Sequence, residues 1–403
     1  MFEKLHTNGR EDSEELPAEF DFHQERFQKM ADIHEQKWWV KAQKIIMKQI
    51  LDRDAVELSA VDFAHEEALR DDVDFERKRD EEEYEASERN LKPVIEALIQ
   101  KRNNPERKDI RTLLVIPGGG MRCAVGAGQA LIGLNAVGMD KAFDNVFGIS
   151  GGGQVAAFFA GGKERSARGA SIFYEECTYG EFIKKTRISR IMNVDVVSNA
   201  MTSGEKELDQ KAVRDSGIGL YLGVTRVDDE KCEIINAKTA RPGIMDALKA
   251  TMAVPLFYGK DIEVNETKYM DGAFDPLPIQ RLIEKFEPTH ILILANVPFN
   301  RVDSFELSPG EYLLAEFLPK VGSLGTMAKF ASNKKQMRES LEFIQKQSGV
   351  NIGILWPPDT NLDTLTTDPY KIEASELEAA RGVIKAFGGE QPRDLNLYHH
   401  ENT

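Results

Sequence analysis

Glycine-rich segments around two polar residues give this chain its candidate chemistry. Gly118-Gly119-Gly120-Met121-Arg122 can form an oxyanion loop, Gly148-Ile149-Ser150-Gly151-Gly152 can place a serine on a tight turn, and Asp271-Gly272-Ala273 offers an acid. Successive amides of a glycine loop can hold a developing negative charge, and a serine beside a base can attack a carbonyl carbon. Together the three segments favour a serine acyl hydrolase as the leading hypothesis.

Ser150 lies between a strand-like run and a helix-like run. Residues 142–147 have the apolar character and length of a strand, and residues 154–160 are typical of a buried helix. A serine on so sharp a turn needs flanking residues without a Cβ, and Gly148 and Gly152 supply them. An ordinary glycine-rich turn in an α/β protein is the alternative that stays open.

The glycine loop follows an expected buried strand. Residues 112–116 are β-branched and apolar, and a helix is expected from about Ala124 to Val137. The positive end of that helix would assist the loop amides, while Arg122 would hold the loop or screen the developing charge. A phosphate loop is the competing interpretation, but a dinucleotide fingerprint would need glycine where Cys123 stands, and the sequence contains no P-loop motif.

The base for Ser150 is the open question of the sequence. His290 is the one histidine within the α/β part, and it follows Asp271 in the Ser, Asp, His order of α/β-hydrolases, so a triad stays open. Because reactive groups gather at the carboxyl ends of parallel strands and His290 begins one, a structural role fits it better. Asp271 is then the candidate base, although Asp-Gly between strand-like residues also predicts a hairpin turn.

Four motifs in chain order resemble those of the patatin-like phospholipases. They lie at residues 118–122, 148–152, 250–257 and 271–273, and the likeness spans roughly residues 110–390. The resemblance implies an α/β fold, a three-layer α/β/α domain with a mostly parallel central sheet.

The resemblance also implies a Ser–Asp dyad that needs no histidine, metal or other cofactor. Ser150 would attack an ester carbonyl, Asp271 would take its proton and later activate water, and the amides of Gly119 and Gly120 would hold the oxyanion. The implied function is a phospholipase A-type acyl hydrolase acting on lipid or phospholipid esters. A small-ester hydrolase with a triad through His290 and a catalytically inactive interaction module stay open as alternatives.

Charge limits the partners of this protein. The net charge of −15 argues against nucleic acid as the main partner and weakens attraction to anionic membranes. Docking on lipid through apolar surface stays open. An expected helix carries a group of apolar residues that could form such a surface or pack in the core. These residues are Tyr312, Leu313, Leu314, Phe317 and Leu318.

Cysteine usage and hydropathy bear on the compartment. The 3 cysteines stand at unrelated spacings, which argues against a disulfide framework. The first residues lack the apolar segment of a signal peptide, and no run of about 18 apolar residues occurs in the sequence. We therefore expect a cytoplasmic protein, with peripheral contact at membranes left open.

The first 109 residues differ in kind from the rest. Dense charge accompanies two expected helices, from Asp21 to about Arg53 and from Ser59 to about Arg102. We expect residues 1–109 to form a charged helical extension, residues 110–390 the acyl hydrolase domain and residues 391–403 a polar tail. Packing on the domain, binding of a protein partner, autoinhibition and disorder stay open as alternatives for the extension.

Overall fold

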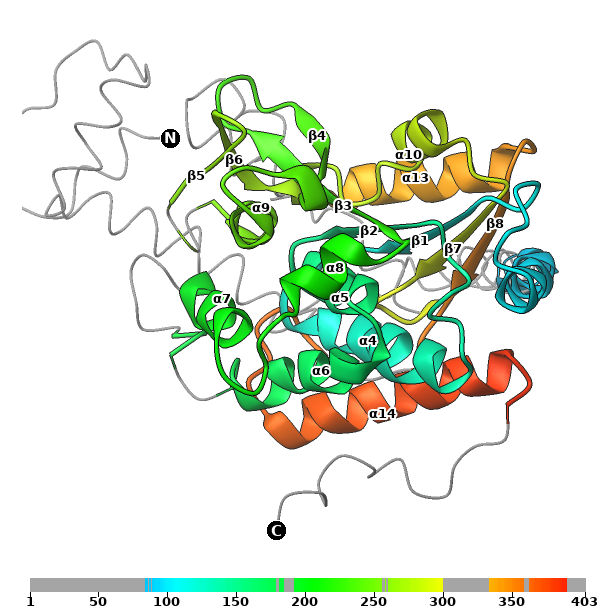
Figure 1. Cartoon of the computed structure of the whole chain (residues 1–403), viewed down its shortest axis with the longest axis horizontal. Coiled ribbons are helices and arrows are strands. Elements are labelled where there is room, and N and C mark those ends of the chain that lie inside the picture. Colours follow the sequence, from blue (N-terminus) through cyan, green and yellow to red (C-terminus); the bar gives the residue numbers. More distant parts are fainter. Residues whose placement is uncertain are drawn as a thin grey trace, which may run out of the picture.

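Helices cover both faces of a central sheet in a three-layer α/β/α arrangement (Figure 1). The computed structural model describes residues 84–389 apart from 86, 88, 179–180, 185–191, 256–257, 259, 300–332 and 359–361. The expected fold class is confirmed. The apolar helix expected around residues 312–318, the helix expected over residues 21–53 and the polar tail lie outside the described residues.

The sheet is mostly parallel. Its strands among the described residues are β1 (Thr112–Ile116), β2 (Asn145–Ile149), β3 (Gly219–Arg226), β4 (Cys232–Asn236), β5 (Ile262–Val264), β6 (Thr267–Asp271), β7 (His290–Leu294) and β8 (Asn351–Leu355). They lie in the order β5-β6-β3-β2-β1-β7-β8, with β4 also paired to β3. The strands from β3 to β8 in this order run parallel, whereas β4 and β6 are antiparallel to β3. The carboxyl ends of the parallel strands therefore share one edge, where sites in such sheets form.

Both faces of the parallel strands are apolar, as strands between two helix layers must be. In β1, Leu114 and Ile116 pack into the larger core, whereas Leu113 and Val115 pack into the smaller one. Helices that contribute to the larger core are α4 (Cys123–Ala127), its π-helical continuation η5 (Gly128–Leu134), α5 (Gly151–Ala160), α6 (Ser166–Glu175), α7 (Val194–Thr202), α8 (Gln210–Asp215), α9 (Ile244–Met252) and α14 (Pro369–Ala386). The smaller core lies under α10 (Ile279–Phe286) and α13 (Asn333–Lys346).

Strand positions agree with the sequence except before Ser150. The strands expected at residues 112–116 and 290–294 are confirmed. The strand expected from residue 142 begins instead at Asn145, because Thr112 ties the preceding residues into a turn. Its Oγ1 donates to the carbonyl of Ala142 and its N–H donates to the carboxylate of Asp144, both at 2.8 Å.

The described end of the N-terminal extension belongs to the core. A helix over residues 89–103, blue in Figure 1, places Val94 and Leu98 in the larger core with 0% and 1% exposure. Lys101 is also buried, and its Nζ donates to two backbone carbonyls at 2.8 and 3.0 Å. A boundary at residue 109 would therefore separate a packed helix from the sheet that it covers.

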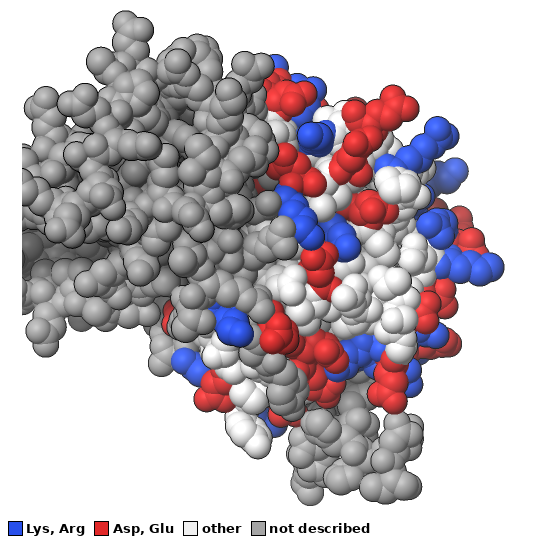
Figure 2. Space-filling view, turned by 90° about the vertical axis from the view of Figure 1, so that its left-hand side faces the viewer, with Lys and Arg blue, Asp and Glu red and all other residues white. Residues whose placement is uncertain are grey.

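Acidic and basic side chains are interspersed on the face shown in Figure 2. Among the helices that the structure describes, none is both long and apolar enough to cross a membrane.

Candidate active site

Ser150 occupies the junction between β2 and α5 in a strained conformation. Its φ of 54° and ψ of −131° are rare for a residue with a Cβ. It is the N-cap of α5, yet its side chain makes no capping hydrogen bond, so the hydroxyl stays available beside the positive end of the helix. The Ser150 N–H donates to Thr251 Oγ1 at 2.9 Å, which holds the turn in place.

The glycines around Ser150 are required by close packing. A Cβ on Gly148 would lie 2.4 Å from the carbonyl oxygen of Gly152, and a Cβ on Gly152 would lie 2.3 Å from that of Ile116. A Cβ on Gly151 would lie 2.9 Å from the Cβ of Cys123. Larger residues would push α5 away from β1 and the glycine loop, so the motif G-x-S-x-G has a steric reason here.

Sheet register brings Asp271 to the level of Ser150. Ile149 of β2 pairs with Gly223 of β3 in parallel, and Val224 of β3 pairs with Asp271 of β6 in the antiparallel sense. Ser150, which follows Ile149, and Asp271 therefore lie on opposite sides of β3. Because neighbouring strands lie about 4.8 Å apart, side chains that face each other across one strand can meet. The antiparallel direction of β6 delivers its last residue to this place.

The hairpin interpretation of Asp271-Gly272 is wrong. The turn between β5 and β6 falls at Asn265 and Glu266, whose φ values of 51° and 64° are those of a type I′ turn. Gly272 instead opens the short turn η8 (Gly272–Phe274), and a Cβ there would lie 2.2 Å from the carbonyl oxygen of Gly223.

Asp271 is a buried acid with a pKa near neutrality. It is 0% exposed, and burial raises its pKa to about 7, opposed by the Ser150 hydroxyl and by the N–H of Ala273, which donates to Oδ1 at 2.8 Å. The Ser150 hydroxyl lowers the pKa of Asp271, but the two side chains are not joined by a formed hydrogen bond. Asp271 Oδ2 has no hydrogen-bond partner among the described residues. Such contacts commonly tighten only when substrate binds.

One turn of chain at the end of α9 holds both candidate residues. Thr251 is fully buried, and its Oγ1 accepts the Ser150 N–H and donates to the carbonyl of Gly223 at 2.6 Å. The carbonyl of Ala253 accepts the Asp271 N–H at 3.0 Å. The motif at residues 250–257 points to this segment, but the role of Thr251 was not predicted from the sequence; Leu256 and Phe257 lie outside the described residues.

The glycine loop lies against the serine turn. A Cβ on Gly118 would be 3.1 Å from the Cβ of Ser150. Gly120 has a positive φ of 58°, and a Cβ there would lie 2.7 Å from the carbonyl oxygen of Thr364. The loop closes through η4 (Gly120–Arg122), where the Arg122 N–H donates to the carbonyl of Gly119 at 3.2 Å. This bond comes from the backbone of Arg122, so the roles considered for its side chain stay predictions.

His290 lies at the other edge of the sheet. It begins β7 beside Thr112, the first residue of β1, so the length of a strand, about 13 Å, separates it from the edge that carries Ser150. Its Nδ1 is 2.9 Å from Thr289 Oγ1 and its Nε2 is 3.1 Å from Asn351 Nδ2, while burial lowers its pKa. This placement suits a structural residue and not a base for Ser150.

The cysteines do not compete with Ser150 as nucleophiles. Cys123 is fully buried, and burial raises the pKa of its thiol to about 12, so it holds its proton at neutral pH. Cys177 is also buried with a raised pKa, and Cys232 is partly buried with a raised pKa. No group of three His, Cys, Asp or Glu residues is arranged to hold a metal ion within the described part of the chain.

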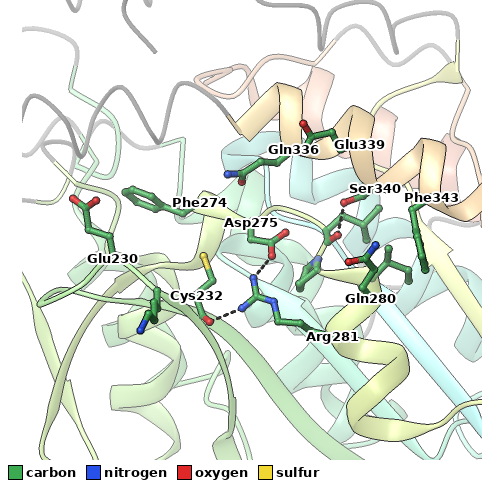
Figure 3. A pocket seen from close by; sticks show the side chains of 14 residues that line it. Glu230, Cys232, Phe274, Asp275, Gln280, Arg281, Gln336, Glu339, Ser340 and Phe343 are labelled. Atoms are coloured by element: carbon green, nitrogen blue, oxygen red, sulfur yellow. Dashed lines mark hydrogen bonds and ion pairs between the residues drawn. The ribbon is translucent and has the colours of Figure 1, made fainter. Parts of the chain in front are cut away.

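A cavity of about 650 Å³ lies between β4, η8, α10 and α13 (Figure 3). Arg281 crosses its wall, paired with Asp275 and donating to the carbonyl of Cys232 at 2.5 Å, and Ser340 Oγ donates to the carbonyl of Leu277 at 2.7 Å. Cys232 lines it, but neither Ser150 nor Asp271 does. Gln336 Oε1 on its wall has no hydrogen-bond partner among the described residues, whereas the hydroxyl of Ser340 is already bound to a backbone carbonyl. The pocket therefore offers no free serine, and the serine turn is the better candidate for chemistry.

Comparisons with known proteins add little. No protein-family model and no curated protein sequence matches this chain. Among solved structures it is similar to the crystal structure of VipD from Legionella pneumophila, with a TM-score of 0.34 and 12% sequence identity over 70% of this chain and 67% of the other. A likeness this weak supports no conclusion about this chain.

Proposed function

We propose that this protein is a lipid acyl hydrolase of phospholipase A type, with Ser150 as nucleophile and Asp271 as general base. The observation that carries the proposal is a buried carboxyl group with a pKa of about 7 across β3 from a serine on a strained strand-to-helix turn. The glycine loop against that turn supports acyl chemistry in particular. Lipid esters as the substrate class follow from the resemblance of the motifs to patatin-like phospholipases.

Acylation uses the groups already described. Ser150 Oγ attacks the ester carbonyl carbon as its proton passes to Asp271 Oδ2, and the carbonyl π electrons move to the oxygen. The amides of Gly119 and Gly120 and the positive end of α5 stabilise that oxyanion. When the intermediate collapses, the C–O bond to the alcohol breaks, the alcohol leaves with the proton from Asp271, and an acyl-enzyme remains.

Deacylation repeats the steps with water. Asp271 takes a proton from a water molecule as the water oxygen attacks the acyl carbon. The proton then passes from Asp271 to Ser150 Oγ as the carboxylic acid product leaves. No step uses His290, a metal ion or a cofactor. A pKa near 7 suits both halves of the cycle, because the same carboxyl group must accept a proton and give it back.

Hydrolysis of a panel of esters tests the proposal. Soluble p-nitrophenyl esters of increasing acyl length and phospholipid vesicles should be cleaved by the wild-type protein and not by Ser150→Ala. Preference for long acyl chains would support lipids as the substrate class. Cleavage confined to the shortest esters would favour a small-ester hydrolase, and a folded wild-type protein that cleaves none would favour an inactive interaction module.

A further inference from the structure

Asn296 lies just beyond the end of β7, beside the glycine loop. It follows β7, which runs parallel to β1 with Val115 opposite Ile293, so the chain beyond each strand continues side by side. Asn296 is 8% exposed, and its Nδ2 donates to the carbonyl of Gly118 at 2.5 Å and lies 3.5 Å from that of Pro117. A buried side-chain amide is thus attached to the backbone of the loop.

Peptide geometry turns this contact into control of an amide direction. The C=O of Gly118 and the N–H of Gly119 belong to one planar trans peptide, so they point in opposite directions. With Asn296 fixing the carbonyl, the Gly119 N–H must point to the other side. The bond from the Arg122 N–H to the Gly119 carbonyl fixes the next peptide, and hence the Gly120 N–H, in the same way.

The two amides so directed are available. Among the described residues, no backbone or side-chain acceptor takes the N–H of Gly119 or Gly120. Gly118 packs on the Cβ of Ser150, and the ideal Cβ of Gly151 lies 3.3 Å from the Gly120 carbonyl oxygen, so the loop touches the nucleophile turn on both sides. Donors of an oxyanion hole act because they are aimed before the charge develops.

We propose that Asn296 is a positioning residue that aims the Gly119 amide at the oxyanion; this rests on the proposed function. Without the side-chain amide of Asn296, the half-buried Gly118 carbonyl loses its partner, and the Gly118–Gly119 peptide is free to rotate. The Gly119 N–H then no longer meets the charge in the transition state. Ground-state binding of the substrate, which carries no such charge, changes little.

The test compares two ketones with the acyl chain of the best ester. Ser150 adds to a trifluoromethyl ketone and forms a tetrahedral oxyanion, with its proton on Asp271, whereas the matching methyl ketone binds without adding. In Asn296→Ala, we expect kcat and the affinity for the trifluoromethyl ketone to fall together, each by about 10²-fold. KM and the affinity for the methyl ketone should stay within about threefold.

A second substitution and a control sharpen the result. Asn296→Asp keeps the shape but presents a charge to the Gly118 carbonyl, and it should be at least as defective as the alanine variant. Asn351→Ala removes an asparagine that contacts His290 at the opposite edge of the sheet, and it should behave as wild type.

Three results would overturn the assignment. Wild-type kcat in Asn296→Ala or in Asn296→Asp would exclude a positioning role, and equal loss of both ketones would show a general defect of folding or binding. A wild-type protein that neither hydrolyses esters nor binds the trifluoromethyl ketone more tightly would sink the proposed function itself, and this inference with it.

Discussion

The protonation state of Asp271 sets when Ser150 can react. A general base must be ionised, and burial holds the pKa of Asp271 at about 7, so the fraction of ionised carboxyl falls as pH drops below 7. We predict that kcat/KM for a soluble ester rises with pH and levels off above a midpoint near 7. A profile measured from about pH 5 to about pH 9 with an ester of constant charge checks this.

Asp271→Asn provides the control for that profile. Asparagine keeps the shape and an acceptor for the Ala273 amide but cannot take a proton, so the variant should fold and lose both activity and the midpoint. An unchanged midpoint in a residually active Asp271→Asn protein would assign the titration to another group.

Prediction from sequence works at residue scale where the reason is local. Gly148 and Gly152 flank Ser150 within one turn, so their need to lack a Cβ is visible in the motif. The roles of Thr251 and Asn296 are not predicted from the sequence, because their hydrogen-bond partners lie 101 and 178 positions away along the chain. No local pattern marks a threonine or an asparagine for such a contact. The fold alone brings them to the site.

The same division holds for the elements. Strands β1 and β7 are continuous apolar runs, and the sequence predicts them directly. The sequence misplaces the start of β2 and the turn between β5 and β6. Hydrogen bonds from the N–H and Oγ1 of Thr112 decide the first, and the second lies where Asn265 and Glu266 adopt positive φ. Competing local signals were present, and tertiary contacts selected between them.

Helix α14 carries a buried carboxyl group without hydrogen-bond partners among the described residues. Glu376 is 1% exposed, neither carboxylate oxygen has a hydrogen-bond partner among the described residues, and its backbone carbonyl would lie 2.0 Å from a Cβ on Gly128 of η5. Burial raises the pKa of Glu376 well above its usual value, and the charges of Glu373 and Glu175 raise it further. The folded protein therefore keeps a proton that the unfolded chain releases.

We predict that Glu376→Gln stabilises the fold increasingly as pH rises. Above the ordinary glutamate pKa, the folded state binds more protons than the unfolded state, so this group lowers the free energy of unfolding by about 1.4 kcal/mol per pH unit until its folded pKa is reached. Glutamine removes that dependence. Urea denaturation of both proteins near pH 5 and pH 8 should show the gap widening by at least about 1 kcal/mol; a constant gap would contradict the prediction.

At the scale of the whole molecule, the useful boundary lies before the helix over residues 89–103. Deletion of residues 1–83 should leave a cooperatively folding domain with Ser150 intact, because that cut spares Val94, Leu98 and Lys101. Deletion of residues 1–109 removes those contacts and should aggregate or melt at a much lower temperature, since several kcal/mol of core packing are lost, on the order of 3 or more. Thermal melts of the two proteins compare them.

The shorter deletion also tests a regulatory role for residues 1–83. If they cover a lipid-docking face, their removal should raise cleavage of phospholipid vesicles more than cleavage of a short soluble ester, since only vesicles must reach apolar surface. Equal effects on both substrates would remove autoinhibition from consideration.

The longer deletion has its own contradicting outcome. A cooperative, stable protein after deletion of residues 1–109 would contradict the place of the 89–103 helix in the core.

The most direct test of the Ser150–Asp271 account is covalent labelling by a fluorophosphonate, followed by peptide mass mapping. The wild-type protein should carry one adduct, on Ser150, with loss of fluoride, and His290→Ala should label at a similar rate. Asp271→Asn should label at least about 10²-fold more slowly, as expected for loss of a general base, and Ser150→Ala should not label. An adduct on another residue, or a folded His290→Ala protein as unreactive as Ser150→Ala, would contradict the account.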